Sequence, residues 1–67
     1  MIQIFVIDNL RKHNADQLKT ALETVEGLRV LKIDISAGVV KLDYNKKADE
    51  YVKLATEVVG AFLRTRV

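Results

Sequence analysis

The 67-residue chain carries the same local pattern twice, and this repetition limits what it can fold into. Each half reads as a strand, then a helix with apolar residues at spacings of three and four, then a second strand. A glycine follows each helical stretch, at Gly27 and at Gly60, where a left-handed residue commonly ends a helix. We therefore expect one domain with the element order βαββαβ.

The elements follow from the apolar periodicity. We expect strands over residues 2–7, 30–35, 39–44 and 62–67, and helices from Asn14 to Gly27 and over 48–59. Asn14 and Gln17 are placed as the N-cap and third residue of the first helix. In the second helix, the expected buried stripe is Tyr51, Leu54, Ala55 and Val58.

This element order closes as a ferredoxin-like sandwich, an α+β fold with both helices on one face of a four-stranded antiparallel sheet. Right-handed crossovers give the strand order 4-1-3-2. The apolar strand Ile2–Ile7 is then central, and the strand 30–35 lies at an edge. In that edge strand, Leu31 and Ile33 are expected to face opposite to Lys32 and Asp34, whose charges oppose edge-to-edge association.

The uncovered face of this sheet is the largest candidate binding surface. Alternation places six charged residues on it, Lys32, Asp34, Lys41, Asp43, Arg64 and Arg66. The first strand contributes either Ile2, Ile4 and Val6 or Gln3, Phe5 and Ile7. The polarity of Gln3 favours exposure of the second set. The strand pattern alone does not decide between the two alternatives. Either choice leaves large apolar side chains within a frame of charges, which is typical of a protein-docking surface.

Residues 18–45, LKTALETVEGLRVLKIDISAGVVKLDYN, resemble the heavy-metal-associated domain family. That family includes small copper chaperones and N-terminal domains of metal-transporting ATPases. The shared features are Glu26-Gly27-Leu28 after the first helix, the strand Val40–Tyr44, and Gly60 followed by Phe62. The resemblance extends over nearly all of residues 1–67 and implies a single domain of this fold. It also favours burial of Gln3, Phe5 and Ile7.

The chain departs from that family at the metal site. The family carries Met-x-Cys-x-x-Cys after its first strand, whereas Arg11 and Asn14 occupy the two cysteine positions here and the chain has no cysteine. A guanidinium and an amide cannot replace the thiolates that Cu(I) and Zn(II) require. The resemblance thus implies the fold without a cysteine metal site.

The segment Arg11-Lys12-His13-Asn14 is the candidate binding loop. A helix start offers unpaired N–H groups and the positive end of the helix dipole, and Arg11 and Lys12 add charge for an anion or an acidic protein surface. His13 is the only histidine. We expect it to be exposed just ahead of the helix.

Other classes of function find little support. The net charge of +2 comes from interspersed basic and acidic residues, so nucleic-acid binding is not expected. The longest apolar run, Ile4–Ile7, is far below the roughly 20 residues of a membrane span. No secretory signal begins the sequence, which favours a cytoplasmic location. No nucleophile–base–acid arrangement is present, so we expect no enzyme activity and no cofactor.

The expected function is a non-enzymatic protein-interaction or regulatory domain in a metal-homeostasis or transport setting. It would dock through the sheet face while Arg11 and Lys12 steer an acidic partner or a transporter domain. One alternative is a metal-binding domain that uses Asp8, His13 and Asp16 in place of cysteines. A homodimer through the sheet face or edge is a further alternative.

Overall fold

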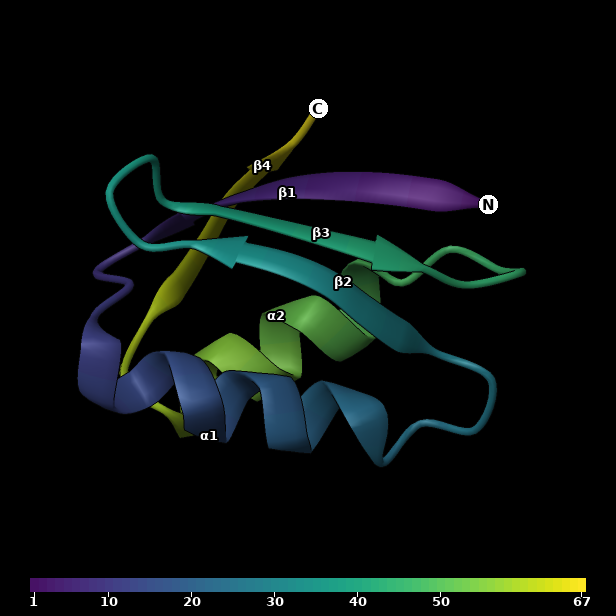
Figure 1. Cartoon of the computed structure of the whole chain (residues 1–67), viewed down its shortest axis with the longest axis horizontal. Helices are drawn as coiled ribbons and strands as arrows, with labels where there is room; N and C mark the ends of the chain where they lie inside the picture. Colours follow the sequence, from purple (N-terminus) through teal and green to yellow (C-terminus); the bar gives the residue numbers. More distant parts are fainter.

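The computed structural model describes residues 1–67 and contains the six expected elements. The strands are β1 (Ile2–Asp8), β2 (Arg29–Asp34), β3 (Val39–Asp43) and β4 (Phe62–Arg66), and the helices are α1 (Lys12–Glu23) and α2 (Asp49–Val58). Their order along the chain is βαββαβ, as predicted (Figure 1).

The strands form one antiparallel sheet in the order β2-β3-β1-β4, which confirms the predicted topology. Both helices lie on the same side of this sheet, so its other side has no covering layer (Figure 1). This is the ferredoxin-like α+β arrangement. Neither helix combines enough length with enough apolar sequence to span a membrane.

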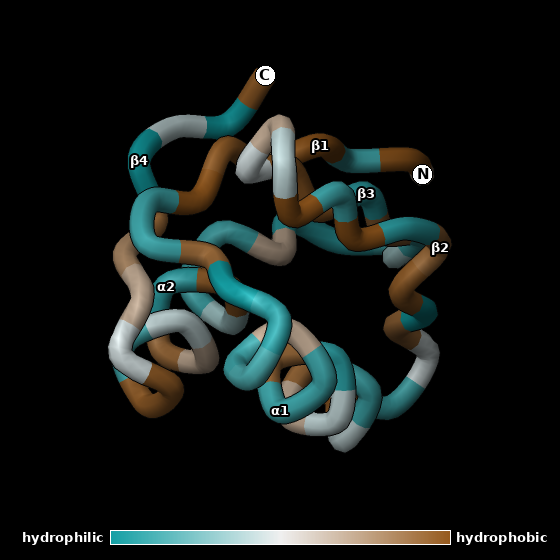
Figure 2. The backbone as a smooth tube through the Cα atoms, turned by 60° about the vertical axis from the view of Figure 1, so that its left-hand side comes forward, coloured by the Kyte–Doolittle hydropathy of each residue, from teal (hydrophilic) through white to brown (hydrophobic).

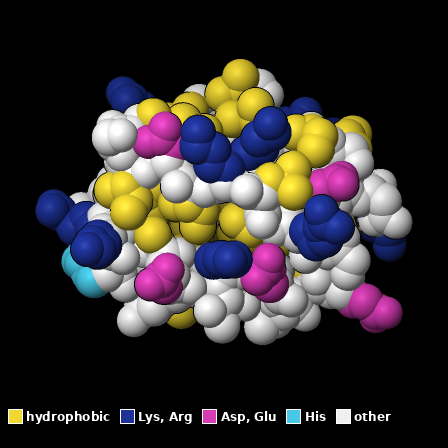
Figure 3. Space-filling view, in the orientation of Figure 1, with side chains coloured by type: hydrophobic (Ala, Val, Ile, Leu, Met, Phe, Trp, Pro, Cys, Tyr) yellow, Lys and Arg dark blue, Asp and Glu magenta, His cyan; other side chains and the backbone are white.

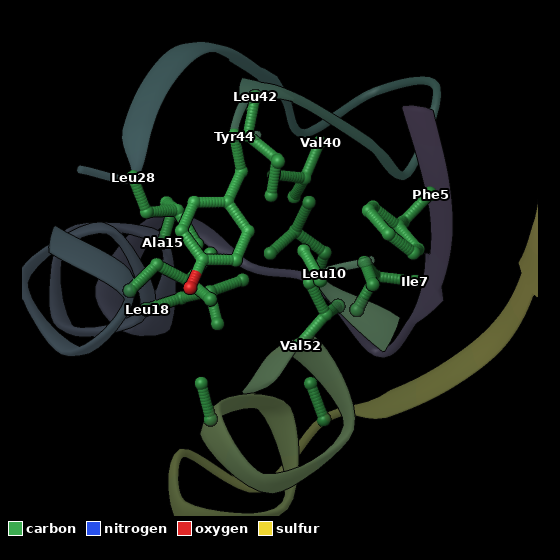
Figure 4. Close-up of a cluster of buried hydrophobic side chains, with 14 residues drawn as sticks. Phe5, Ile7, Leu10, Ala15, Leu18, Leu28, Val40, Leu42, Tyr44 and Val52 are labelled. Carbon is green, nitrogen blue, oxygen red and sulfur yellow. The ribbon is translucent and has the colours of Figure 1, made fainter. Parts of the chain in front are cut away.

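The hydrophobic core lies between the sheet and the two helices. β1 is hydrophobic along most of its length (Figure 2), and Phe5 and Ile7 point into the cluster that also receives side chains from β3 and α2 (Figure 4). Phe5, Leu18, Leu22, Val40, Leu42 and Val52 have no exposed surface. Removing such side chains from water is the main force that holds a small domain together.

β1 buries Gln3, Phe5 and Ile7, which decides between the two alternatives left open by the sequence. Gln3 is only 4% exposed, although it is polar. Its Nε2 donates to the Lys46 carbonyl at 2.6 Å, and its Oε1 accepts from the Ala48 N–H at 3.0 Å. Because both ends of the amide are bonded, burial of Gln3 fastens the segment before α2 to the sheet.

Two register shifts alter the predicted strand faces. In β2 the shift lies between Val30 and Lys32, so Val30 and Ile33 both pack against the core while Leu31 is left exposed. The predicted alternation therefore fails at Leu31, where a bulge adds one residue to the strand. Lys32 still lies opposite Lys41, on the uncovered face.

The second shift moves the arginines of β4. It lies opposite Val6 and Ile7, which pair with Thr65 and Leu63, so Arg64 is the extra residue. Arg66 pairs with the buried Phe5 and therefore lies on the helix side, with its Nη1 3.6 Å from Oδ1 of Asp49 in α2. Placing Arg66 on the open face was wrong.

The start of α1 also differs from the prediction. Arg11 is the N-cap, so α1 begins at Lys12 and Asn14 is its third residue. His13 lies within the first helical turn rather than ahead of it. At the other end, the helix stops at Glu23, and Gly27 adopts its left-handed φ of +83° in the turn that follows.

α2 ends as predicted but buries a different face. The Gly60 N–H donates to the Glu57 carbonyl at 3.3 Å and the Ala61 N–H to the Thr56 carbonyl at 2.8 Å. With φ of +81° at Gly60, this is a Schellman ending. The buried residues of α2 are Val52, Ala55 and Thr56. Of the predicted buried stripe, Tyr51, Leu54 and Val58 are instead exposed.

Candidate functional site

The predicted binding loop combines two kinds of residue. Arg11, Lys12 and His13 are exposed, and no ion pair involves any of them. Asn14 is only 2% exposed. The segment therefore presents two cations and an imidazole at the start of α1, while the fourth candidate residue faces the interior.

Asn14 organises this loop through three hydrogen bonds. Its Oδ1 accepts from the Arg11 N–H at 2.8 Å. Its Nδ2 donates to the Asn9 carbonyl at 3.0 Å and to the Val59 carbonyl at 3.5 Å. The amide thus joins the β1–α1 loop to the end of α2, and its burial leaves almost no surface that a ligand could contact.

Asn9 completes the same network and was not singled out from the sequence. Its Nδ2 donates to the Gly60 carbonyl at 2.8 Å, and its Oδ1 accepts from Arg11 Nε at 2.9 Å. Its φ is +63°, which asparagine tolerates better than most residues. An asparagine directly after a strand is a signal that such a turn follows. We call Asn9, Arg11 and Asn14 the asparagine loop.

The alternative metal site at Asp8, His13 and Asp16 does not form. Among residues 1–67, no group of three or more His, Cys, Asp or Glu side chains lies close enough together to hold a metal ion. Asp8 instead lies near Arg64, with 3.8 Å between Oδ1 and Nη1. The geometry therefore offers no observation in favour of oxygen and nitrogen ligation.

The uncovered sheet face carries a row of aliphatic side chains. Ile2, Ile4 and Val6 alternate with the buried residues of β1, and Val39 of β3 lies opposite Val6. Ile2 is half exposed, whereas Ile4 and Val6 are partly covered by their neighbours. We call these four residues the aliphatic row.

Two lysines border this row. Lys41 lies directly opposite Ile4 on one side and Lys32 on the other, so the two ammonium groups come from neighbouring strands on the same face. Neither lysine forms an ion pair. Like charges directly opposite each other destabilise a sheet. We call Lys32 and Lys41 the lysine pair. Figure 3 shows that, on the face it displays, Lys and Arg side chains lie beside hydrophobic ones.

The acidic side chains of this face are engaged elsewhere. Oδ1 of Asp34 accepts from the Ala37 N–H at 3.0 Å and from the Ser36 hydroxyl at 2.9 Å. These bonds hold the pKa of Asp34 below its ordinary value, with a smaller effect from Lys32. Asp43 accepts from the Met1 amino group at 2.7 Å, which likewise lowers the pKa of Asp43. Neither carboxylate lies within ion-pair distance of Lys32 or Lys41.

The structure therefore separates the sequence candidates into two regions. The asparagine loop is held by its own hydrogen bonds, and the side chains of Arg11, Lys12 and His13 at the start of α1 are exposed. The sheet face combines the aliphatic row with the lysine pair. In comparisons with protein-family models, curated proteins and solved structures, nothing matches this chain.

Proposed function

We propose that this chain is a non-enzymatic interaction domain whose uncovered sheet face docks an acidic surface of another protein. The observation that carries the proposal is the lysine pair, two facing cations without partners, set directly beside the aliphatic row. A partner that presents a carboxylate next to apolar side chains would satisfy both features at once.

The aliphatic row supplies the apolar part of such an interface. Its members come from two adjacent strands and form a continuous surface. Covering Ile2, Ile4 and Val6 removes apolar area from water, which favours association by about 25 cal/mol for each Å². Because these side chains belong to a rigid central strand, little conformational entropy is lost when they are covered.

The lysine pair supplies orientation and selectivity. An acidic group between Lys32 and Lys41 would relieve the repulsion between the two ammonium groups. A basic partner would increase that repulsion, so the pair discriminates by charge. Arg11 and Lys12 extend the positive potential to the end of β1, where they would raise the rate of encounter with an acidic protein.

The sequence resemblance to heavy-metal-associated domains supports a metal-homeostasis or transport setting for this docking. A partner of that kind would be an acidic domain of a transporter or of a chaperone. The absence of cysteine at the two family ligand positions, Arg11 and Asn14, favours a role in binding a protein rather than in carrying Cu(I) or Zn(II).

Photocrosslinking in the producing cells tests the proposal. A photoreactive residue at Ile4 on the sheet face is compared with one at Lys19 on the helix side. We expect position 4 to give a discrete crosslinked protein, and Lys32→Glu/Lys41→Glu to abolish this product. The control Lys19→Glu/Lys47→Glu carries the same charge change and should keep it. Identical products from positions 4 and 19, or a product insensitive to the lysine pair, would contradict docking through this face.

A further inference from the structure

α2 leaves three large apolar side chains uncovered on the helical layer, far from the sheet face. Tyr51 is 43% exposed, Leu54 59% and Val58 82%. Their spacing of three and four residues places them along one stripe of the helix. The stripe borders a shallow groove, whose other wall is formed by Ala21 of α1 and by Thr24 and Val25 just after its end.

The stripe is held in a defined position. The ring of Tyr51 packs edge-to-face against the buried Tyr44, with 5.9 Å between ring centroids and planes at 80°. Ala55, on the core side of Leu54, is buried. The apolar surface is therefore preformed, so a partner would cover it with little ordering cost.

Two charged residues of opposite sign, Lys53 and Glu57, accompany the stripe along α2. Lys53 and Glu57 lie one turn apart and are both exposed, and no ion pair involves either residue. Lysine four residues before glutamate is the weaker order for an ion pair within one helix. Both side chains thus remain available to a second molecule.

The stripe and the charges have midpoints only half a residue apart. Tyr51 and Val58 are centred between Leu54 and Ala55, and Lys53 and Glu57 are centred on Ala55. In two antiparallel helices related by a twofold axis beside Leu54 and Ala55, Tyr51 would meet the partner's Val58. Lys53 would meet the partner's Glu57, and symmetry would repeat each contact. A self-complementary patch of this kind is what an isologous interface requires.

We propose that a second copy of this chain covers the α2 stripe, with the two helices antiparallel and Leu54 beside the twofold axis. The self-complementary charges favour a second copy over a foreign helix, which would need its own matching acid and base. Because the stripe lies in the helical layer, both sheet faces of the dimer stay uncovered. The proposal does not depend on what the sheet face binds.

Analytical ultracentrifugation over a concentration series at low salt tests the dimer. We expect a monomer–dimer equilibrium in the unmodified chain. Lys53→Glu and Glu57→Lys each place like charges at positions 53 and 57 of the facing helices, and the twofold axis repeats this repulsion. Each variant should therefore weaken dimerisation roughly tenfold, which corresponds to about 1.4 kcal/mol. The double variant Lys53→Glu/Glu57→Lys exchanges the two charges and should restore the dimer.

Two further variants give the contrast. Val58→Asp places a carboxylate on the most exposed residue of the stripe and should leave the chain monomeric and folded by circular dichroism. Lys19→Glu makes the same charge change as Lys53→Glu, but on the side of α1 that faces β2. This variant should dimerise like the unmodified chain. A chain that is monomeric at every concentration overturns the proposal. So does a dimer that Val58→Asp does not dissociate, or one that the charge exchange fails to restore.

Discussion

The asparagine loop and the lysine pair are both gatherings of polar side chains, yet they differ in what their hydrogen-bonding groups contact. In the loop, Asn9, Arg11 and Asn14 bond to one another and to the end of α2. On the sheet face, Lys32 and Lys41 oppose each other without an acidic partner. The polar groups of the loop therefore contribute to stability, whereas the lysine pair has no ion pair within the chain that could do so.

The largest effect should follow from Asn14→Ala. The substitution leaves the Arg11 N–H and the Asn9 carbonyl without their partner in a nearly buried position. Because each unsatisfied group costs about 1–3 kcal/mol, we expect the free energy of unfolding to fall by about 2–3 kcal/mol. Urea unfolding measures the change.

Lys12→Ala is the matched control, one helical residue that is exposed and has no ion pair. It should change the free energy of unfolding by less than about 0.5 kcal/mol. If Asn14→Ala were as mild as Lys12→Ala, the network would be incidental and Asn14 would again be a candidate for binding.

Gln3→Met should lower the free energy of unfolding by less than Asn14→Ala does. The apolar methionine side chain has about the same length as glutamine and fills much of the same space, but the Ala48 N–H loses its acceptor. We expect a destabilisation of about 1–2 kcal/mol by thermal or urea unfolding. Ile4→Met on the opposite face of the same strand should cost less than Gln3→Met, since Ile4 is only partly covered. Equal losses at the two positions would show that the buried amide contributes nothing.

The overall fold was predictable because it depends on patterns that persist over many residues. Two strand–helix–strand units and the connection rules suffice to give the sheet order β2-β3-β1-β4. The glycine signal was also reliable at Gly60, where the helix ends with both Schellman hydrogen bonds. At Gly27 the same signal marks a turn three residues beyond the C-cap Thr24.

Individual faces were less predictable because one inserted residue reverses an alternation. Bulges at Leu31 and Arg64 are invisible to a count of period two, and the second of them carries Arg66 to the helix side. Asn14 is a favoured N-cap type, but its amide is required inside, between the loop and α2. Local preference therefore yields to tertiary contacts at the residues that make up the candidate site.

A gain in stability is expected from Lys41→Glu. The change converts the facing lysines into an opposite-charge pair, which should stabilise the domain by about 0.2–1 kcal/mol at low salt. Lys41→Gln, which only removes the repulsion, should fall between Lys41→Glu and the unmodified chain. Unfolding at low and high ionic strength measures both the gain and its screening. A loss of stability in Lys41→Glu would mean that Lys41 has a partner in the folded chain, and the contrast with the loop would fail.

The smallest effect concerns the carboxylate of Asp34. The pKa of Asp34 is lowered chiefly by the Ala37 N–H and the Ser36 hydroxyl, and only secondarily by Lys32 of the lysine pair. A lowered pKa in the folded state stabilises the fold above the ordinary value near 3.8 and loses that effect as the pH falls through the folded value. We therefore expect the stability difference between the unmodified chain and Asp34→Ala to shrink as the pH falls below about 4. An NMR titration should find the pKa of Asp34 still lowered in Lys32→Gln and at high salt, because backbone and hydroxyl donors are unchanged. If the pKa returned to its ordinary value in Lys32→Gln, Asp34 would be the missing partner of the lysine pair, and the sheet face would have no cation to spare.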